Sequence, residues 1–353
     1  MKTKTINQEF NIKPKEFSKN KKERSSNIEL LRIILAIFVI LIHYVGYWYL
    51  PFLCGTVNCF TIITGYFLIK NNDNYRFLKF IPTIVFLHVI NICLFIFFNY
   101  STSYRIIENK EGWIELIQYG LGAWWYIWAI FILYIISPFL NYGMQTLGKN
   151  TSLVLIISLW IVFQLQGLLK YSFAPFGYYW GSFVMMIYAY LLGGYIRLHG
   201  AKLLEWKKSI WVITILFLAI QYMFFFLYKE FYPNQILWLD FSNNNQSLFA
   251  LPTGFLMFIS FLTIPLKNYK VINFLASLSL FTFAYHNSSL KFSSYFIYVL
   301  NLKNTFLIHR LIALLITFVI SFAVWWPFKK YDYAWNIVYK KIEAKNVKSQ
   351  IQN

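Results

Sequence analysis

Ten long apolar runs, separated by short polar breaks, constrain this chain more than any other feature. A helix needs about 20 apolar residues to cross a bilayer, and these runs approach that length. They do not alternate apolar with polar residues, as the strands of a membrane barrel would. We therefore expect an all-α, polytopic membrane protein of about ten transmembrane helices. The predicted spans are 27–50, 52–69, 77–98, 117–140, 151–169, 179–197, 209–228, 248–266, 272–290 and 305–328.

The composition excludes an ordinary soluble protein. Hydrophobic residues make up 59% of the chain and charged residues 13%, whereas a soluble domain carries about 25% charged residues. No single soluble core could hide so much apolar surface. The net charge of +19 does not indicate a nucleic-acid partner, because the basic residues lie in short clusters between the apolar runs, as topology signals do.

The positions of lysine and arginine predict the orientation. With the N-terminus in the cytoplasm, the inner loops and tails hold 24 basic residues and the outer loops hold six, so both ends are expected inside. We predict a basic cytoplasmic tail over 1–26, a membrane domain over 27–328 and a second basic tail over 329–353. The tails are expected to be partly disordered and attracted to anionic lipid headgroups. Within 52–69, Gly55 and Asn58 predict a broken or tilted helix.

The first span carries the most informative polar set, which is Glu29, Arg32 and His43. Eleven residues separate Arg32 from His43, so both project from one helix face, about 16 Å apart along the axis. Glu29 lies one turn before Arg32 and can pair with it. That pair is either a functional group or a snorkelling pair at the membrane edge. His43 lies too deep to snorkel, which favours a functional role.

A second histidine, His286, lies in the ninth predicted span at a matching depth. Both spans begin on the inside, so both histidines are expected about 21–23 Å deep, in the outer half. Trp124, Trp125 and Tyr126 of the fourth span fall at a similar height. These groups predict a converging site, although polar residues of different helices can also simply satisfy one another.

The remaining histidines give weaker signals. We expect His88 to be a core residue, His199 to be solvated in an inner loop, and His309 with Arg310 to anchor the outer end of the tenth span. Three cysteines within apolar stretches do not form a disulfide framework or a zinc site. No metal site is predicted, because the histidines lack ligand spacing and no carboxylate accompanies them. No phosphate loop or Rossmann glycine pattern is present.

Arg76 and Lys79 follow the second span and lie one helical turn apart. Such a pair can hold a phosphate, but a topology signal would look the same.

Together these residues resemble the membrane-bound acyltransferase 3 family, from about Asn27 to Phe328. The first span is similar to the family's opening signature of an acidic residue, an arginine three later and a histidine eleven after that. The resemblance continues, in the expected order, through four more segments. These are Asn58 to Tyr66, Arg76 to Lys79, Trp125-Tyr126 to Pro138, and Phe283-Ala-Tyr285-His286. The departures are Thr64, where serine is usual, and Lys79, where arginine is usual.

The resemblance implies O-acetylation in the bacterial cell membrane, within the biosynthesis of a capsule or exopolysaccharide. The acyl group is expected to be acetyl, and it would pass from cytoplasmic acetyl-CoA to a hydroxyl of a surface glycan or its lipid-linked precursor. Acetyl-CoA would be a co-substrate and not a bound cofactor. Arg76 and Lys79, together with Arg32, would hold the nucleotide phosphates, and His43 would act as general base or carry the acyl group. His286 or the Trp125-Tyr126 pair would orient a substrate, and Thr64 and Tyr285 belong to the implied binding site.

Two other classes rank below this hypothesis. A transporter or a flippase of lipid-linked glycans would show paired broken helices in its two halves, but only 52–69 has that character. A glycan polymerase would carry a large outer loop, whereas the longest outer segments predicted here have about 20 residues.

Overall fold

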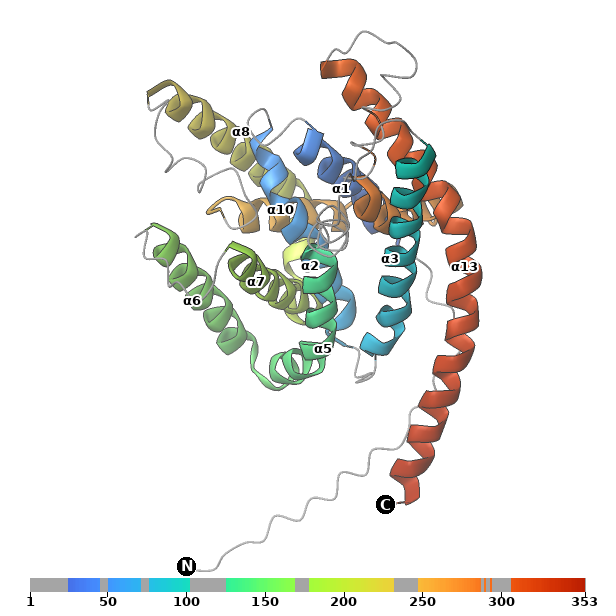
Figure 1. Cartoon of the computed structure of the whole chain (residues 1–353). Helices are drawn as coiled ribbons and strands as arrows, with labels where there is room; N and C mark the ends of the chain where they lie inside the picture. The colour runs from blue at the N-terminus through green and yellow to red at the C-terminus, as the bar shows by residue number, and fades with distance from the viewer. Residues whose placement is uncertain are drawn as a thin grey trace, which may run out of the picture.

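The computed structural model describes residues 25–44, 50–70, 76–101, 125–168, 178–231, 247–286, 289, 293 and 306–352. Every regular element within these ranges is helical, as Figure 1 shows. Residues 279–286 are also helical and follow α11 almost directly. The helices are α1 (Ser26–Tyr44), η1 (Pro51–Gly55), α2 (Thr56–Leu68), α3 (Arg76–Ser101), α5 (Trp125–Thr146), α6 (Lys149–Leu168), α7 (Tyr178–His199), η2 (Leu203–Glu205), α8 (Lys207–Phe231), α10 (Ala250–Leu262), α11 (Lys270–Ser277) and α13 (Phe306–Gln352).

The helices confirm the predicted membrane class. Among the described residues, six helices are long and apolar enough to cross a bilayer, and three shorter apolar helices accompany them. Each of the ten predicted spans overlaps a helix, although the count of ten crossings itself stays a prediction. The part of the fourth predicted span before Trp125 lies outside the described residues.

The second predicted span is broken at one of the two expected positions. The short 3₁₀ helix η1 ends at Gly55 and α2 begins at the next residue. Asn58, in contrast, lies inside α2 and does not interrupt it. A Cβ atom on Gly55 would lie 2.7 Å from the backbone nitrogen of Gly254 on α10. The break therefore coincides with a close approach between two backbones, which only glycine allows.

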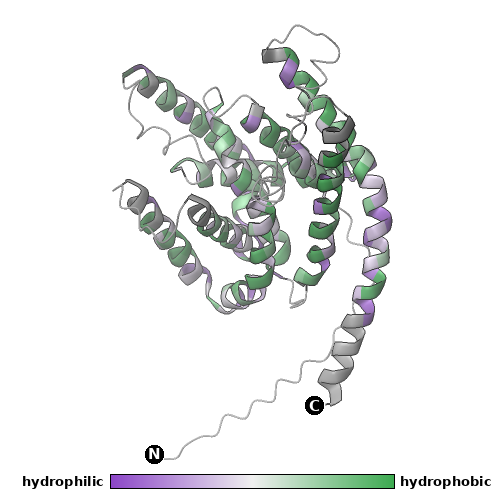
Figure 2. Cartoon of the chain, viewed as in Figure 1, coloured by the Kyte–Doolittle hydropathy of each residue, from purple (hydrophilic) through white to green (hydrophobic). Residues whose placement is uncertain are grey.

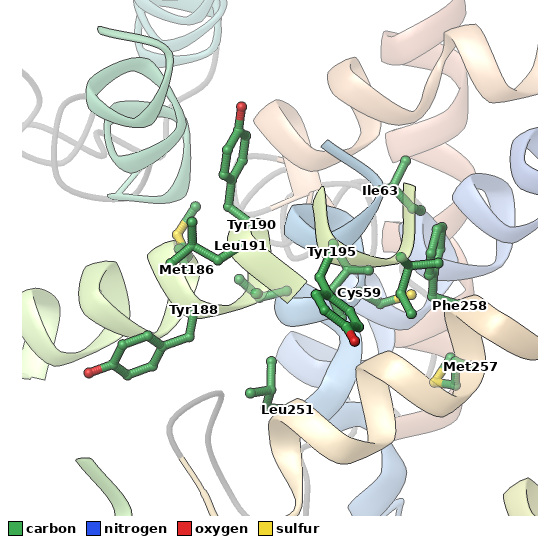
Figure 3. Packing of buried hydrophobic residues seen from close by; sticks show 14 of the residues in the cluster. Cys59, Ile63, Met186, Tyr188, Tyr190, Leu191, Tyr195, Leu251, Met257 and Phe258 are labelled. Atoms are coloured by element: carbon green, nitrogen blue, oxygen red, sulfur yellow. The ribbon is translucent and has the colours of Figure 1, made fainter. Parts of the chain in front are cut away.

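The centre of the bundle is the packing of α2 against α7 and α10. Figure 3 shows buried side chains of these three helices meeting around Cys59, Tyr195 and Phe258. The helices α2 and α7 approach so closely that a Cβ on Gly65 would lie 2.0 Å from the Tyr190 carbonyl oxygen. Small residues that let helix backbones meet are typical of membrane bundles.

Hydrogen bonds join the helix ends that were expected at the inner surface of the membrane. Side chains from the end of one helix bind the end of another, so these ends lie together at one end of the bundle. The bonds run from Asn141 to the Leu68 carbonyl (2.9 Å), from Arg197 to the Tyr66 hydroxyl (3.1 Å), from Trp211 to Thr263 (3.2 Å) and from Asn27 to the Leu262 carbonyl (3.3 Å).

The last helix differs from the sequence prediction. Residues 329–353 were expected to form a partly disordered tail, yet α13 continues without interruption to Gln352. Its 47 residues extend over about 70 Å, roughly twice the thickness of a bilayer core. Figure 2 shows a mainly apolar first half followed by a stretch of mixed character. Phe328, Tyr331 and Tyr339 contact α3, which lies beside the middle of α13 in Figure 1.

Candidate functional site

A cavity of about 440 Å³ opens between α1, α2, α3, α5 and the helical segment 279–286. It extends from the end of the bundle where the inner helix ends gather, at the first two turns of α1, to Tyr126 at the start of α5. Its wall is mostly apolar and aromatic, with a few polar groups, as is common for small-molecule sites. The lining residues are Glu29, Arg32, Phe60, Ile63, Thr64, Phe67, Leu68, Phe80, Tyr126, Ile127, Ile130, Tyr134, Ser279, Leu280 and Phe283.

The charged group in this cavity is the predicted pair of Glu29 and Arg32. Their side chains form an ion pair with an N–O distance of 3.1 Å, and the second guanidinium nitrogen lies 3.4 Å from the Ser279 hydroxyl. The Arg32 side chain is 34% exposed and that of Glu29 is 12% exposed. A guanidinium has five N–H donors, so Arg32 can bind an anionic group in the cavity while it keeps both of these contacts.

The two predicted histidines meet one another. The ring centroids of His43 and His286 lie 4.5 Å apart, so the expectation that they share one level is confirmed. His43 is exposed near the end of α1, whereas His286 is buried. Nδ1 of His286 lies 2.6 Å from the Phe283 carbonyl oxygen. Because a carbonyl only accepts, this nitrogen donates, and in the neutral ring Nε2 is the atom that can take a proton.

Both ends of the predicted motif on α1 face the same helical segment. Arg32 contacts Ser279, and His43 contacts His286 seven residues further along. The eleven-residue spacing on α1 was expected to place Arg32 and His43 on one face, and these contacts confirm it.

Two aromatic residues connect the cavity to the histidines. Phe283 and Tyr126 both line the cavity, and their rings lie 4.6 Å apart. The Phe283 ring lies 5.7 Å from that of His286. The ring of Phe283 therefore lies between the cavity and the histidine pair.

The other predicted site residues on these helices take different positions. Thr64 lines the cavity, and its hydroxyl donates to the Phe60 carbonyl at 2.9 Å. Trp125 packs edge-on against Tyr126 at 6.0 Å, outside the lining, and Trp124 lies outside the described residues. Tyr285 is fully buried outside the lining, and its hydroxyl donates to the Leu87 carbonyl at 3.3 Å. The predicted substrate-binding roles of these residues stay predictions.

Of the predicted basic pair on α3, Lys79 is not among the residues that line the cavity. Arg76 is the first residue of α3, and its side chain lies outside the described part of the chain. The Lys79 ammonium lies 4.0 Å from the ring centroid of Tyr339 on α13. The next residue, Phe80, does line the cavity and stacks on Tyr134 with centroids 5.4 Å apart.

Among the lining residues that sequence reasoning missed are Ser279, which contacts Arg32, and Phe283, whose ring lies against that of His286. They precede His286 by seven and three residues, so they lie on one face of the same helix. Helical spacing places both on the face of His286, but it does not say that this face lines a cavity.

The weaker histidines lie apart from the cavity. The His88 ring packs 5.9 Å from Trp128, and that of His199, expected in a loop, lies at the end of α7 against Tyr195. In the described ranges, no group of three or more His, Cys, Asp or Glu side chains converges as metal ligands would.

Comparison with known proteins gives the family. The model of the acyltransferase domain of the acyltransferase 3 type matches residues 25–326, which include the whole cavity lining and both histidines. No curated protein and no solved structure gave a significant match. Since the family match covers most of the chain, this membrane protein is an acyltransferase and belongs to the acyltransferase 3 family.

Proposed function

We propose that this protein transfers an acetyl group from cytoplasmic acetyl-CoA to a hydroxyl of a bacterial surface polysaccharide or its lipid-linked precursor. The observation that carries this proposal is the closeness of the cavity to the histidine pair. An arginine-bearing cavity at one end is separated from a histidine pair by the single ring of Phe283. Transfer from a cytoplasmic donor to an outer acceptor needs a donor pocket that ends close to a proton acceptor, because the base, the hydroxyl and the thioester carbon must meet in one place.

The donor is assigned to the cavity because of its chemistry. Arg32 supplies a cation that binds phosphate or polarises a carbonyl, and the apolar wall suits the thioester arm. The cavity reaches the end of the bundle predicted to face the cytoplasm, where acyl-CoA is found. Lys79 contacts Tyr339, so the phosphate grip in this proposal rests on Arg32 and on Arg76 at the start of α3.

The reaction assigned to the histidines is addition and elimination at the thioester carbon. The acceptor hydroxyl loses its proton to the imidazole of His43 while its oxygen forms a bond to the carbonyl carbon. The C–S bond then breaks, and the coenzyme thiolate takes a proton to leave as the free thiol. His286, whose ring contacts His43 and whose Nδ1 is fixed by the Phe283 carbonyl, holds the base in place.

The acceptor is assigned to the far side of the histidine pair. His43 is exposed near the end of α1, on the side predicted to face outward. A hydroxyl presented from outside the cell would meet the imidazole there.

The test is to replace His43 by alanine in cells and to measure acetyl esters on the surface polysaccharide. His88→Ala is the matched control, since His88 is a histidine of α3 whose ring packs on Trp128 outside the cavity lining. We expect loss of acetylation in the first variant and wild-type acetylation in the second. Acetylation retained by His43→Ala at normal membrane levels would contradict the proposal.

A further inference from the structure

The part of α13 that packs on α3, between Phe328 and Tyr339, lies beyond the residues that the family match covers. The Phe86 ring on α3 stacks on Tyr331 with centroids 5.3 Å apart, and it meets Phe328 edge-on at the same distance. Two turns closer to the start of α3, Lys79 meets Tyr339, which lies two turns further along α13. The two helices therefore run antiparallel in a matched register.

Tyr339 is the residue that fixes this contact. Its side chain is 2% exposed, while its neighbours Ile337 and Val338 are each 44% exposed. The Lys79 ammonium lies 4.0 Å above the ring centroid, well within the distance at which a cation is attracted to an aromatic face. Elsewhere in the described part of this segment, Tyr333 is 71% exposed.

The turn of α3 that Tyr339 contacts also carries a wall of the cavity. Phe80 follows Lys79 directly, lines the cavity and stacks almost parallel on Tyr134 of α5, with an interplanar angle of 4°. Successive helix residues project about 100° apart, so α13 on one flank and α5 on the other hold this turn between them. The first residue of the same turn is Arg76.

We propose that residues 327–341 of α13 form a strap that fixes the first turn of α3, and that Tyr339 is a positioning residue for the donor cavity. This inference rests on the proposed function, because it assigns the donor to that cavity. Tyr339 touches neither the cavity nor a substrate. It acts through Lys79, which anchors the strap and is not a phosphate ligand.

The first experiment compares three variants of the purified full-length protein. Tyr339→Ala removes the ring, Tyr339→Phe keeps it, and Tyr333→Ala removes an exposed tyrosine of the same helix as a control. We expect Tyr339→Ala to raise KM for acetyl-CoA about three- to tenfold, the range of one cation–π contact, with kcat little changed. The Tyr339→Phe and Tyr333→Ala variants should keep the wild-type KM. An unchanged KM in Tyr339→Ala would overturn the proposal.

A double-mutant cycle tests whether Tyr339 acts through Lys79. If it does, Lys79→Gln combined with Tyr339→Ala raises KM no more than the larger single change. If Lys79 instead binds phosphate directly, Lys79→Gln raises KM as much in the Tyr339→Ala background as in the wild type. Effects on KM that multiply in this way would overturn the proposal that Lys79 anchors the strap.

A measurement without substrate separates this inference from the proposed function. Spin labels at Val89→Cys on α3 and Ile337→Cys on α13, both at exposed positions, report the distance between the helices. Exposed Cys93 is replaced by serine, since Cys54 and Cys59 are buried. We expect one narrow distance distribution that Tyr339→Ala broadens and Tyr339→Phe does not. If Tyr339→Ala leaves the distance distribution unchanged, the strap is overturned. If Tyr339→Ala broadens the distribution but the wild-type protein does not bind acetyl-CoA, the strap stands. The proposed function and the role of Tyr339 at the donor site are then overturned.

Discussion

At the scale of single residues, the site depends on which side chains of 279–286 face α1. The sequence predicted Arg32, His43 and the depth of His286 because helical spacing alone fixes direction and height. It did not predict Phe283, because several aromatic residues surround it and periodicity does not say which one faces the cavity. The ring of Phe283 lies between the cavity and His286, so we expect it to limit the space for the acyl group.

Replacing Phe283 by alanine should widen the acyl specificity. Removal of the ring lengthens the cavity towards His286, so butyryl-CoA should gain about tenfold in kcat/KM relative to acetyl-CoA, a typical effect of pocket size. The matched control is Phe281→Ala, because Phe281 is buried on the same helix but packs on Phe328 outside the cavity lining. An equal shift in the control, or none in Phe283→Ala, would show that Phe283 does not bound the acyl site.

At the scale of helices, the close contact between α2 and α7 positions the cavity. The helix α2 supplies Phe60, Ile63, Thr64 and Phe67 to the lining, and glycines of both helices lie at the crossing. A Cβ on Gly193 would lie 2.0 Å from the Ile62 carbonyl oxygen. A backbone atom cannot turn aside as a side chain can, so α7 would have to move away from α2.

Gly193→Ala should therefore destabilise the protein and disturb the cavity. We expect a loss of about 1–3 kcal/mol, typical of overpacking, visible as a lower midpoint of thermal unfolding in detergent. Gly143→Ala is the control, because no atom outside its own helix lies within 4 Å of the added Cβ. That change should leave the midpoint unchanged or raise it, since alanine is favoured over glycine in a helix by about 0.5–1 kcal/mol. Equal midpoints in the two variants would refute the tight crossing.

Some features of the helices could be predicted from the sequence and others could not. The break at Gly55 could be predicted because glycine within an apolar run is a local signal. The helical structure of residues 329–352 could not, because lysines and polar residues there have the composition of a solvated tail. The stabilising partner of Tyr339 is Lys79, 260 residues away in the chain, and no local pattern reports such a contact. The same contact explains why Lys79 is not in the cavity where the basic motif had suggested it.

At the scale of the whole molecule, the membrane class followed from composition, and the orientation stays a prediction. The two ends of α8 offer a direct test, because Lys208 and Phe231 are both exposed and lie about 35 Å apart along the helix. In a Cys93→Ser background, Lys208→Cys should react with an impermeant maleimide only after the cells are permeabilised. Phe231→Cys should react in intact cells. The opposite pattern would invert the orientation and place the cavity outside.

We propose that the arginine cavity and the histidine pair are two ends of one site. The most direct measurement is the release of free coenzyme thiol from acetyl-CoA by purified protein supplied with acceptor glycan. Arg32→Gln should raise KM for acetyl-CoA about tenfold or more, since a charged hydrogen bond contributes about 1.5–3 kcal/mol. His43→Ala should instead lower kcat at least about a hundredfold and leave the affinity for acetyl-CoA unchanged. Thiol release by His43→Ala at the wild-type rate, or an unchanged KM in Arg32→Gln, would contradict the account.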